Sequence, residues 1–291
     1  MTGPAGAEPD RVPDHMPART TGRTPGGAAY TLHAPAGAGD VPVVLVAGAG
    51  GSGRIWEHHQ VPALTAAGHR VVTFDHPPGA SGPAGLARAV SELMGDLGLP
   101  PCPLVGHSLG ALAVQELLLE EPRLASGALL AATRGRPDPV GRAMARAEAA
   151  LADAGGNRLP PAYEAFVRLG QNLSPRTLAD GGAVEEWLDL FEIGALTGPA
   201  TLHGPAAPDR DRLADYARIT APVQVVGFAD DLLAPAPLGR EVAGAIPGAR
   251  WTVLPDTGHL GFLERPTAFN ALLLDFLAAL APTDPGAARV H

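Results

Sequence analysis

A serine set between two glycines is the strongest chemical signal in the sequence. Gly106, Ser108 and Gly110 belong to a G-x-S-x-G pentapeptide that directly follows the apolar run 103–105 and directly precedes the predicted helix 109–121. A serine on such a sharp strand-to-helix turn projects its hydroxyl above the sheet, and only small residues two positions before and after it avoid a clash. The helix N-terminus favours developing negative charge. The pattern predicts a nucleophilic serine for acyl transfer.

A serine hydroxyl needs a general base, and the base needs a carboxylate that orients it. Both residue types follow downstream, each after a predicted strand. Asp230 and Asp231 come after the apolar run 224–226, and His259 lies in a loop after the run 251–254. The order along the chain is therefore serine, aspartate, histidine, which differs from the orders of the two unrelated serine protease folds.

The chain around these side chains alternates between short apolar runs and helical stretches. Runs rich in β-branched residues, separated by helices, predict a parallel sheet with crossover helices, and therefore an α/β fold. The expected strands are 41–47, 70–74, 103–105, 127–131, 222–227 and 250–254. The expected helices are 56–67, 85–97, 109–121, 238–245 and 266–281. The candidate catalytic side chains then lie at the carboxyl ends of strands, where open α/β sheets bind ligands.

One long segment, residues 134–219, interrupts this alternation with helical periodicity and no strand pattern. The helices expected in it are 142–154, 163–169 and 184–193. Because the segment lies between two sheet strands, we expect a helical cap over the carboxyl end of the sheet. The predicted domains are a flexible N-terminal tail (1–28), an α/β core (29–133 and 220–282), the cap (134–219) and a flexible C-terminal tail (283–291).

With these motifs, the chain resembles the α/β-hydrolase family with a helical lid, over about residues 41–281. The resemblance implies an α/β-hydrolase fold, which is a mostly parallel sheet flanked by helices with a helical cap inserted between two strands. Ser108 matches the family's nucleophile and His259 its base. The family's D-x-x-x-P pattern selects Asp231 as the acid, since a proline lies four residues on, with Asp230 as the alternative.

The resemblance also implies an oxyanion hole made by two backbone N–H groups. One belongs to Leu109, which follows the nucleophile, and the other to Ala49, in the glycine-rich loop after the strand 41–47. The family begins this loop with His-Gly, whereas the present chain has Ala47 in place of the histidine. Losing that side chain does not by itself remove the Ala49 donor. The loop also matches the spacing of a dinucleotide-binding G-x-G-x-x-G, which stays as an alternative.

Several other side chains are of residue types that could serve a function. Trp187 and Phe191 in the cap segment are candidates for lining an acyl pocket, although aromatic residues at helical spacing are also typical of a core. His58 and His59 have no neighbouring cysteines or acids at ligand spacing, so we expect no metal site. His107, inside the serine motif, is expected to pack behind the turn.

Composition argues against several other functions. The chain has 291 residues, a formal net charge of −9 and 21 basic residues, all of them arginine. This balance disfavours a nucleic-acid binder, a polybasic membrane-surface helix, a Schiff-base lysine enzyme and a Walker-type phosphate loop. A single cysteine excludes an internal disulfide. No apolar run approaches the roughly 20 residues of a membrane span. We expect a cytoplasmic protein without a secretory signal, a membrane span or a cofactor.

The expected activity is a two-step acyl transfer on a small-molecule ester or thioester. With water as acceptor, the protein is a serine esterase or thioesterase. With a bound amine, thiol or hydroxyl it is an acyltransferase, such as those of natural-product biosynthesis that take the acyl group from a carrier protein. The cap arginines Arg134, Arg136, Arg142 and Arg146 form either a docking face for such a carrier or a solvated helix face. A third hypothesis is a lidded pocket that binds a ligand without catalysis.

Overall fold

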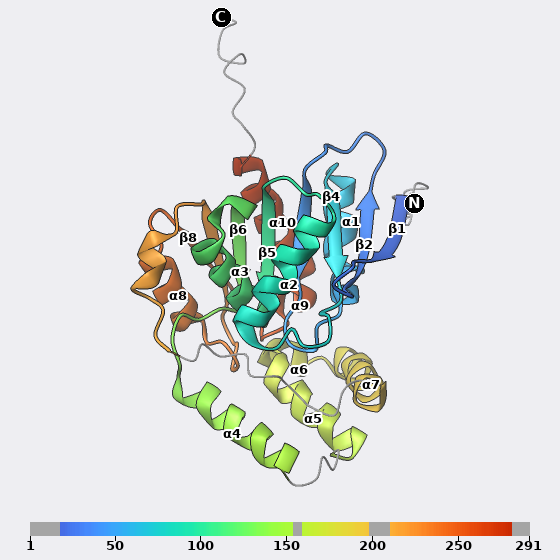
Figure 1. The fold of residues 1–291 in the computed structure, drawn as a ribbon. Helices are drawn as coiled ribbons and strands as arrows, with labels where there is room; N and C mark the ends of the chain where they lie inside the picture. Colours follow the sequence, from blue (N-terminus) through green and yellow to red (C-terminus); the bar gives the residue numbers. More distant parts are fainter. Residues whose placement is uncertain (1–17, 154–158, 198–209, 281–291) are drawn as a thin grey trace, which may run out of the picture.

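The computed structural model describes residues 18–153, 159–197 and 210–280. Its strands form one sheet in the order β1-β2-β4-β3-β5-β6-β7-β8 (Figure 1). The pairs from β4 through β8 are parallel, whereas β1 and β2 are added antiparallel at one edge. The predicted mostly parallel α/β sheet is confirmed. The strands are β1 (Ala18–Arg23), β2 (Ala29–Ala34), β3 (Pro42–Val46), β4 (Arg70–Phe74), β5 (Cys102–His107), β6 (Ala125–Ala131), β7 (Val223–Phe228) and β8 (Arg250–Leu254).

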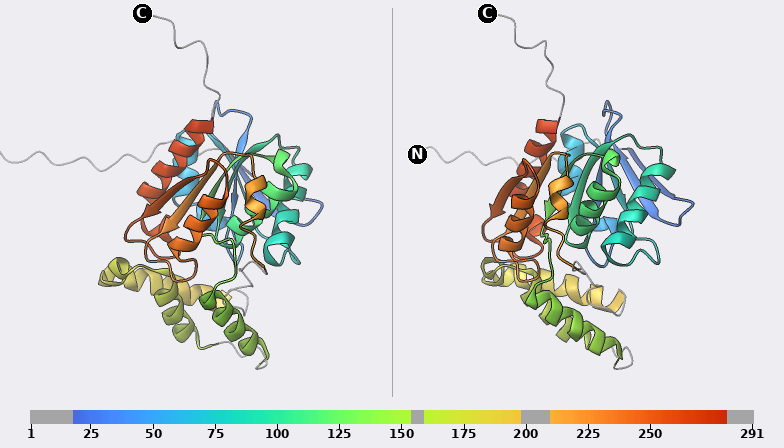
Figure 2. Two further views of the ribbon diagram at one scale, coloured as in Figure 1. Left: turned by 90° about the vertical axis from the view of Figure 1, so that its left-hand side faces the viewer. Right: turned by 60° about the vertical axis from the view of Figure 1, so that its left-hand side comes forward.

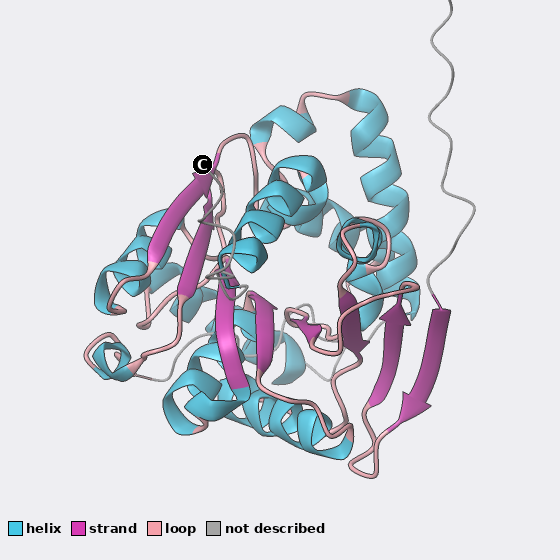
Figure 3. Cartoon of the chain, turned by 90° about the horizontal axis from the view of Figure 1, so that it is seen from above, coloured by secondary structure: helices cyan, strands magenta, loops and turns pink. Residues whose placement is uncertain are grey.

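Helices cover both faces of the sheet (Figure 3). The core helices are α1 (Gln60–Ala66), α2 (Gly82–Asp96), α3 (Leu109–Glu120), α8 (Ala236–Ala245), α9 (Gly261–Glu264) and α10 (Pro266–Leu280), with 3-10 turns η1 (Gly53–Trp56), η2 (Pro122–Leu124) and η3 (Asp215–Arg218). Side chains of α2, α3 and α8 pack on one face, and those of α1 and α10 on the other. Within the described ranges, no helix combines the length and apolarity that crossing a membrane requires.

Strand β3 shows why the strand sequences are continuously apolar. Val44 and Val46 pack into the core under α2 and α3, whereas Val43 and Leu45 pack into the core under α1 and α10. All four are at most 1% exposed. Because successive side chains point to opposite faces of a sheet, a strand with helices on both faces must be apolar at every position.

The N-terminal boundary differs from the prediction. The flexible tail expected over residues 1–28 is too long, because β1 lies within it and pairs with β2 along its whole length. Nearly every residue of β1 is exposed at the sheet edge, so its sequence lacks the apolar alternation that predicts a strand. Residues 1–17 and the predicted C-terminal tail, 283–291, lie outside the described residues.

The cap helices lie between β6 and β7 in the chain and form a layer at one end of the sheet (Figures 1 and 2). They are α4 (Pro139–Asp153), α5 (Pro161–Asn172), α6 (Pro175–Leu178) and α7 (Gly181–Thr197). Helices α5 and α7 pack against each other through a small apolar cluster of their own, formed by Ala165, Leu169, Leu173 and Phe191. Residues 154–158 and 198–209 of this segment lie outside the described residues.

Two of the four arginines considered as a docking face are paired inside the chain. Arg134 is buried, forms an ion pair with Asp138 at 2.5 Å and donates to the Leu233 carbonyl at 2.6 Å. Arg136 donates to both carboxylate oxygens of Glu241, at 2.6 and 2.7 Å. These pairs tie the start of the cap segment to the core. Arg134 is therefore buried and not part of an exposed face, whereas Arg136 and Glu241 are partly exposed, so a docking role for Arg136 stays a prediction.

Candidate active site

The serine motif forms a strained turn between β5 and α3. Ser108 has φ 53° and ψ −117°, a backbone conformation that residues other than glycine rarely adopt. The flanking glycines are required because the backbone packs closely here. A Cβ at Gly106 would lie 2.6 Å from the Gly110 carbonyl oxygen, and a Cβ at Gly110 would lie 2.6 Å from that of Ala47. Close packing of this turn therefore explains the spacing of the motif.

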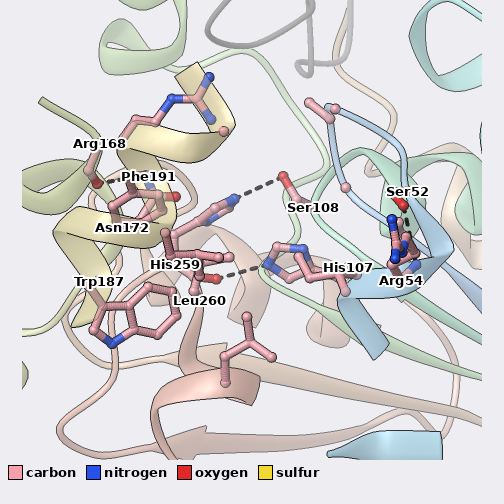
Figure 4. Close-up of a pocket in the computed structure, with 18 of the residues that line it drawn as sticks. Ser52, Arg54, His107, Ser108, Arg168, Asn172, Trp187, Phe191, His259 and Leu260 are labelled. Atoms are coloured by element: carbon pink, nitrogen blue, oxygen red, sulfur yellow. Dashed lines mark hydrogen bonds between the residues drawn. The ribbon is translucent and has the colours of Figure 1, made fainter. Parts of the chain in front are cut away.

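Ser108, His259 and Asp231 lie in one hydrogen-bonded chain. The Ser108 Oγ lies 3.0 Å from Nε2 of His259 (Figure 4), and Nδ1 of His259 lies 2.9 and 3.0 Å from the two carboxylate oxygens of Asp231. All three residues are buried, with at most 9% of their surface exposed. With the Nδ1–H donated to the carboxylate, the Nε2 lone pair is left to accept the serine proton.

Of the two acids after β7, Asp231 is the one that contacts His259. Its Oδ1 also accepts hydrogen bonds from the N–H groups of Leu233 and Ala234, both at 2.8 Å. Burial by itself raises the pKa of this carboxyl, but His259 and the two amides outweigh burial and hold the pKa below its ordinary value. Asp231 is therefore ionised at neutral pH. The Asp230 side chain makes no hydrogen bond or ion pair within the described ranges.

The glycine-rich loop after β3 lies directly against the serine. A Cβ at Gly48 would lie 3.2 Å from the Ser108 Cβ, so the loop approaches the nucleophile with its backbone. Ala49 follows in the lining of the same pocket. Leu109 begins α3 on the other side of Ser108. The two residues predicted to supply the oxyanion hole are therefore placed beside the serine.

The end of β4 supports this loop. The Asp75 carboxylate accepts hydrogen bonds from the Ser52 hydroxyl, at 3.1 Å, and from the Gly53 N–H, at 3.0 Å. The ring of His76 lies so close to Gly51 that a Cβ there would be 2.5 Å from its Nδ1, and the His76 N–H donates to the Gly51 carbonyl at 2.8 Å. Residues that follow β4 therefore hold this loop in place beside Ser108.

A pocket of about 750 Å³ lies above Ser108, between the core and the cap. Trp187 and Phe191 of α7 line it, with ring centroids 5.4 Å apart, and Phe191 also belongs to the apolar cluster between α5 and α7. These aromatic residues therefore both line the pocket and pack in the apolar core of the cap. The remaining cap residues in the lining are Arg168, Asn172, Glu186, Leu190 and Gly194, and the core contributes 47–52, Arg54, Ile55, His58, His59, His107, Leu260 and Leu263.

The pocket lining includes four histidines and Glu186, but their side chains are not arranged as a metal site. Across the part of the chain that the structure describes, no group of three or more histidine, cysteine, aspartate or glutamate side chains is arranged to hold a metal ion. Burial raises the pKa of the Cys102 thiol to about 12, so this cysteine is protonated at neutral pH and unreactive.

Comparison with known proteins identifies the family, because the model of the alpha/beta hydrolase family matches residues 43–272. The chain belongs to the α/β-hydrolase family. A Mycobacterium tuberculosis protein named "Putative non-heme bromoperoxidase BpoC" is 45% identical over 253 residues, which is 84% of this chain and 96% of that protein. Its crystal structure matches with a TM-score of 0.81 and 40% identity, over 93% of this chain and 99% of that chain. A Variovorax paradoxus protein named "Putative carbamate hydrolase RutD" is 31% identical over 262 residues, which is 87% of this chain and 96% of that protein.

These relatives carry the names of enzymes, and the chain is accordingly an enzyme of the α/β-hydrolase family. The predicted family and fold class are confirmed.

In this α/β-hydrolase, the residue before Ser108 also holds the loop that carries His259. The His107 Nε2–H donates to the backbone carbonyl of His259 at 2.8 Å (Figure 4). Its ring packs among Trp56, Phe228 and Phe262, as the predicted packing role requires. Burial, with a smaller contribution from the neighbouring His259, lowers the pKa of His107 to about 3. The ring is therefore neutral and available as a donor.

The buried histidines predict an acid-sensitive fold. Burial lowers the pKa of His107 to about 3 and that of His76 to about 4, from the ordinary value of 6.5. Between these values and pH 6.5, the unfolded chain binds protons that the folded protein does not. The free energy of unfolding therefore falls as the pH falls through this window. Urea unfolding from pH 7 to pH 4 measures this slope, and we expect it to be shallower in His76→Gln and His107→Gln. An unchanged slope in both variants would contradict the prediction.

Glu264 bridges the loop that carries His259 and the cap. Its Oε2 accepts from the Gly258 N–H at 2.5 Å, and its Oε1 accepts from the N–H and hydroxyl of Ser174, at 2.8 and 2.7 Å. On the other side of His259, the N–H of Leu260 donates to the Asn172 carbonyl at 3.1 Å. The loop is thus connected on both sides of His259 to the end of α5 and the residues that follow it. Because Ser174 and Glu264 are 90 residues apart, no local pattern signals this bridge.

Proposed function

We propose that this α/β-hydrolase is a serine hydrolase that cleaves a small ester or thioester through an acyl-enzyme on Ser108. The observation that carries the proposal is the hydrogen-bonded chain from the Ser108 hydroxyl through His259 to Asp231 at the base of a pocket. A nucleophile, a base and an orienting acid within hydrogen-bond reach are what acyl transfer requires.

In the first step, Ser108 Oγ attacks the substrate carbonyl carbon while Nε2 of His259 takes the hydroxyl proton. The resulting oxyanion accepts hydrogen bonds from the N–H groups of Ala49 and Leu109. As the tetrahedral intermediate collapses, His259 gives the proton to the leaving alcohol or thiol. Water then attacks the acyl-enzyme with His259 again as base, and Ser108 is regenerated with release of a carboxylic acid. Asp231 holds the imidazole in the required tautomer throughout.

A second acceptor is supported by the name of the mycobacterial relative, a non-heme bromoperoxidase. Hydrogen peroxide in place of water would break the same acyl–Oγ bond, form a peracid and return a proton to Ser108. The peracid then transfers one oxygen atom and its proton to bromide, which gives hypobromous acid and leaves the carboxylate. Acyl transfer to an amine, thiol or hydroxyl uses the same acyl-enzyme. Product analysis after adding peroxide with bromide, or an amine, to an ester reaction distinguishes these acceptors from water.

The proposal is tested by intact-mass analysis after treatment with a fluorophosphonate. An activated serine should give one adduct, which peptide mapping places on Ser108 and which the Ser108→Ala variant lacks. No adduct on folded wild-type protein would contradict the proposal and favour the alternative of a pocket that binds a ligand without catalysis.

Glu264→Gln is expected to slow catalysis without touching the triad. In the variant, an NH2 group replaces one carboxylate oxygen of Glu264. This NH2 group must face the N–H of either Gly258 or Ser174, and two donors cannot form a hydrogen bond with each other. Losing this charge-assisted hydrogen bond loosens the loop that carries His259, so we expect kcat for an activated ester to fall roughly tenfold with KM little changed. Ser174→Ala, which removes only one of the three donors, is the matched control and should have a smaller effect. A lowered Tm with unchanged kcat would show that Glu264 has only a structural role.

A further inference from the structure

In one ion pair of the cap, the arginine lines the pocket and the glutamate is buried in the protein interior. Arg168 and Glu164 lie one turn apart on α5, with Nη2 of the arginine 2.6 Å from Oε1 of the glutamate. Arg168 lines the pocket above Ser108, whereas Glu164 is buried and is not part of the lining. A ligand in the pocket can therefore contact the positively charged side chain of the pair, whereas the negatively charged side chain is not part of the lining.

The guanidinium group of Arg168 has donors to spare. A guanidinium carries five N–H donors in a planar fork, and Glu164 is reached through one of its nitrogens. Its Nε is buried and has no hydrogen-bond partner in the described part of the chain. The Arg168 side chain is 21% exposed, so the charge is largely removed from solvent. A partly desolvated cation with uncommitted donors binds an anion more strongly and selectively than a fully exposed one.

The charges around the pocket favour the same kind of ligand. Although the chain has a net charge of −9, the charged residues of fixed sign in the lining are two arginines, Arg54 and Arg168, and one acid, Glu186. Figure 4 shows Arg168 and Arg54 on opposite sides of the Ser108–His259 pair. Arg54 is exposed, and its side chain has no ion-pair partner within the described ranges. The two arginines of the lining thus outnumber its one carboxylate, while Glu164 and Asp231 lie outside the lining.

We propose that the substrate of this hydrolase carries a carboxylate in its acyl part, and that Arg168 binds this carboxylate under the cap. The inference rests on the proposed serine hydrolase function and adds a substrate class to it, namely monoesters or thioesters of dicarboxylic acids. The apolar residues of α7 that line the pocket contact the methylene groups between the two carbonyl carbons. Arg168 is then a specificity-determining residue for the acyl part of the substrate.

The test compares two activated esters that differ only at the end of the acyl chain. The 4-nitrophenyl monoester of glutaric acid has a terminal carboxylate, and 4-nitrophenyl pentanoate has a methyl group at the same position. Wild-type kcat/KM should favour the glutarate ester. Arg168→Gln should lower kcat/KM for this ester by at least about tenfold, the effect of one hydrogen bond between charged groups, and change that for the pentanoate ester less than about threefold.

Four further variants make the comparison specific. Arg54→Gln removes the exposed arginine of the lining and should lower kcat/KM for the glutarate ester less than Arg168→Gln does, since exposed charges are screened. Arg142→Gln changes an exposed arginine of α4 outside the lining and is the matched control, so kcat/KM for both esters should change by less than about threefold. Arg168→Lys keeps the positive charge but loses the planar guanidinium group, and should retain part of the preference for the glutarate ester. The double variant Glu164→Gln with Arg168→Gln leaves no uncompensated buried carboxylate, which keeps the test valid if Arg168→Gln does not fold.

The outcomes separate this inference from the proposed function. Equal use of both esters by wild type, or loss of the glutarate preference in Arg54→Gln but not in the Arg168 variants, overturns the inference while leaving the hydrolase intact. Failure of wild type to hydrolyse either ester, together with no fluorophosphonate adduct on Ser108, overturns the proposed function itself.

Discussion

Ser108→Ala is expected to lower kcat for an activated ester by roughly 10⁶-fold, the effect of removing the nucleophile from a complete triad. The reason is that the attacking oxygen is lost, and His259 has no proton to accept. The activity left should be about 10³- to 10⁴-fold above the reaction in water, because the oxyanion-hole amides and substrate binding remain. Steady-state kinetics with active-site titration of the wild type measures the ratio.

The backbone at this position provides a control for folding. Serine and alanine both carry a Cβ, so the strain of φ 53° is the same in wild type and in Ser108→Ala. Ser108→Gly removes that strain and should be at least as stable as wild type, yet equally inactive. Thermal unfolding and kinetics on both variants separate chemistry from stability. Near-wild-type turnover in either variant would mean that Ser108 is not the nucleophile.

Asp231→Asn is expected to lower kcat by roughly 10⁴-fold, as an asparagine does when it replaces the triad acid. The structure indicates how. Oδ1 of Asp231 accepts the N–H groups of Leu233 and Ala234, so the asparagine will direct its only oxygen to these amides. Its NH2 group then takes the place of Oδ2, 2.9 Å from His259 Nδ1. An NH2 donor there favours the tautomer with the proton on Nε2, which cannot accept a proton from Ser108.

The adjacent acid supplies a matched control. Asp230→Asn makes the same chemical change one residue earlier, on a side chain that does not contact His259, and kcat should stay within about threefold of wild type. Nuclear magnetic resonance of the imidazole nitrogens of His259 gives an independent measure of the tautomer in Asp231→Asn. If Asp230→Asn were the more damaging variant, the assignment of the acid would be wrong.

Local sequence was enough to predict the features that depend on neighbouring residues. The parallel sheet follows from apolar runs such as Val43 to Val46, which are buried on both faces. The turn at Ser108 follows from two glycines whose Cβ atoms would collide with the backbone. The order of serine, acid and histidine in the chain then indicated which end of the sheet holds the site. Strand β1 escaped prediction because an exposed edge strand needs no apolar pattern.

Other features were decided only by the tertiary structure, because they join residues far apart in the chain. The fold buries Arg134 against Leu233 and pairs the partly exposed Arg136 with Glu241, and neither contact is signalled by the local sequence. Glu264 gained its role from Ser174, 90 residues away.

The sequence by itself determined the fold class and the residues able to do acyl-transfer chemistry, since strand burial and tight turns depend on local side-chain size and polarity. The tertiary structure brought Asp231, which the sequence pattern already favoured over Asp230, to His259. It also placed Arg168 in the pocket lining and buried Glu164 outside it. The physical reason is that hydrogen bonds and ion pairs depend on distances of about 3 Å. Between elements that are distant in sequence, such distances are set by packing.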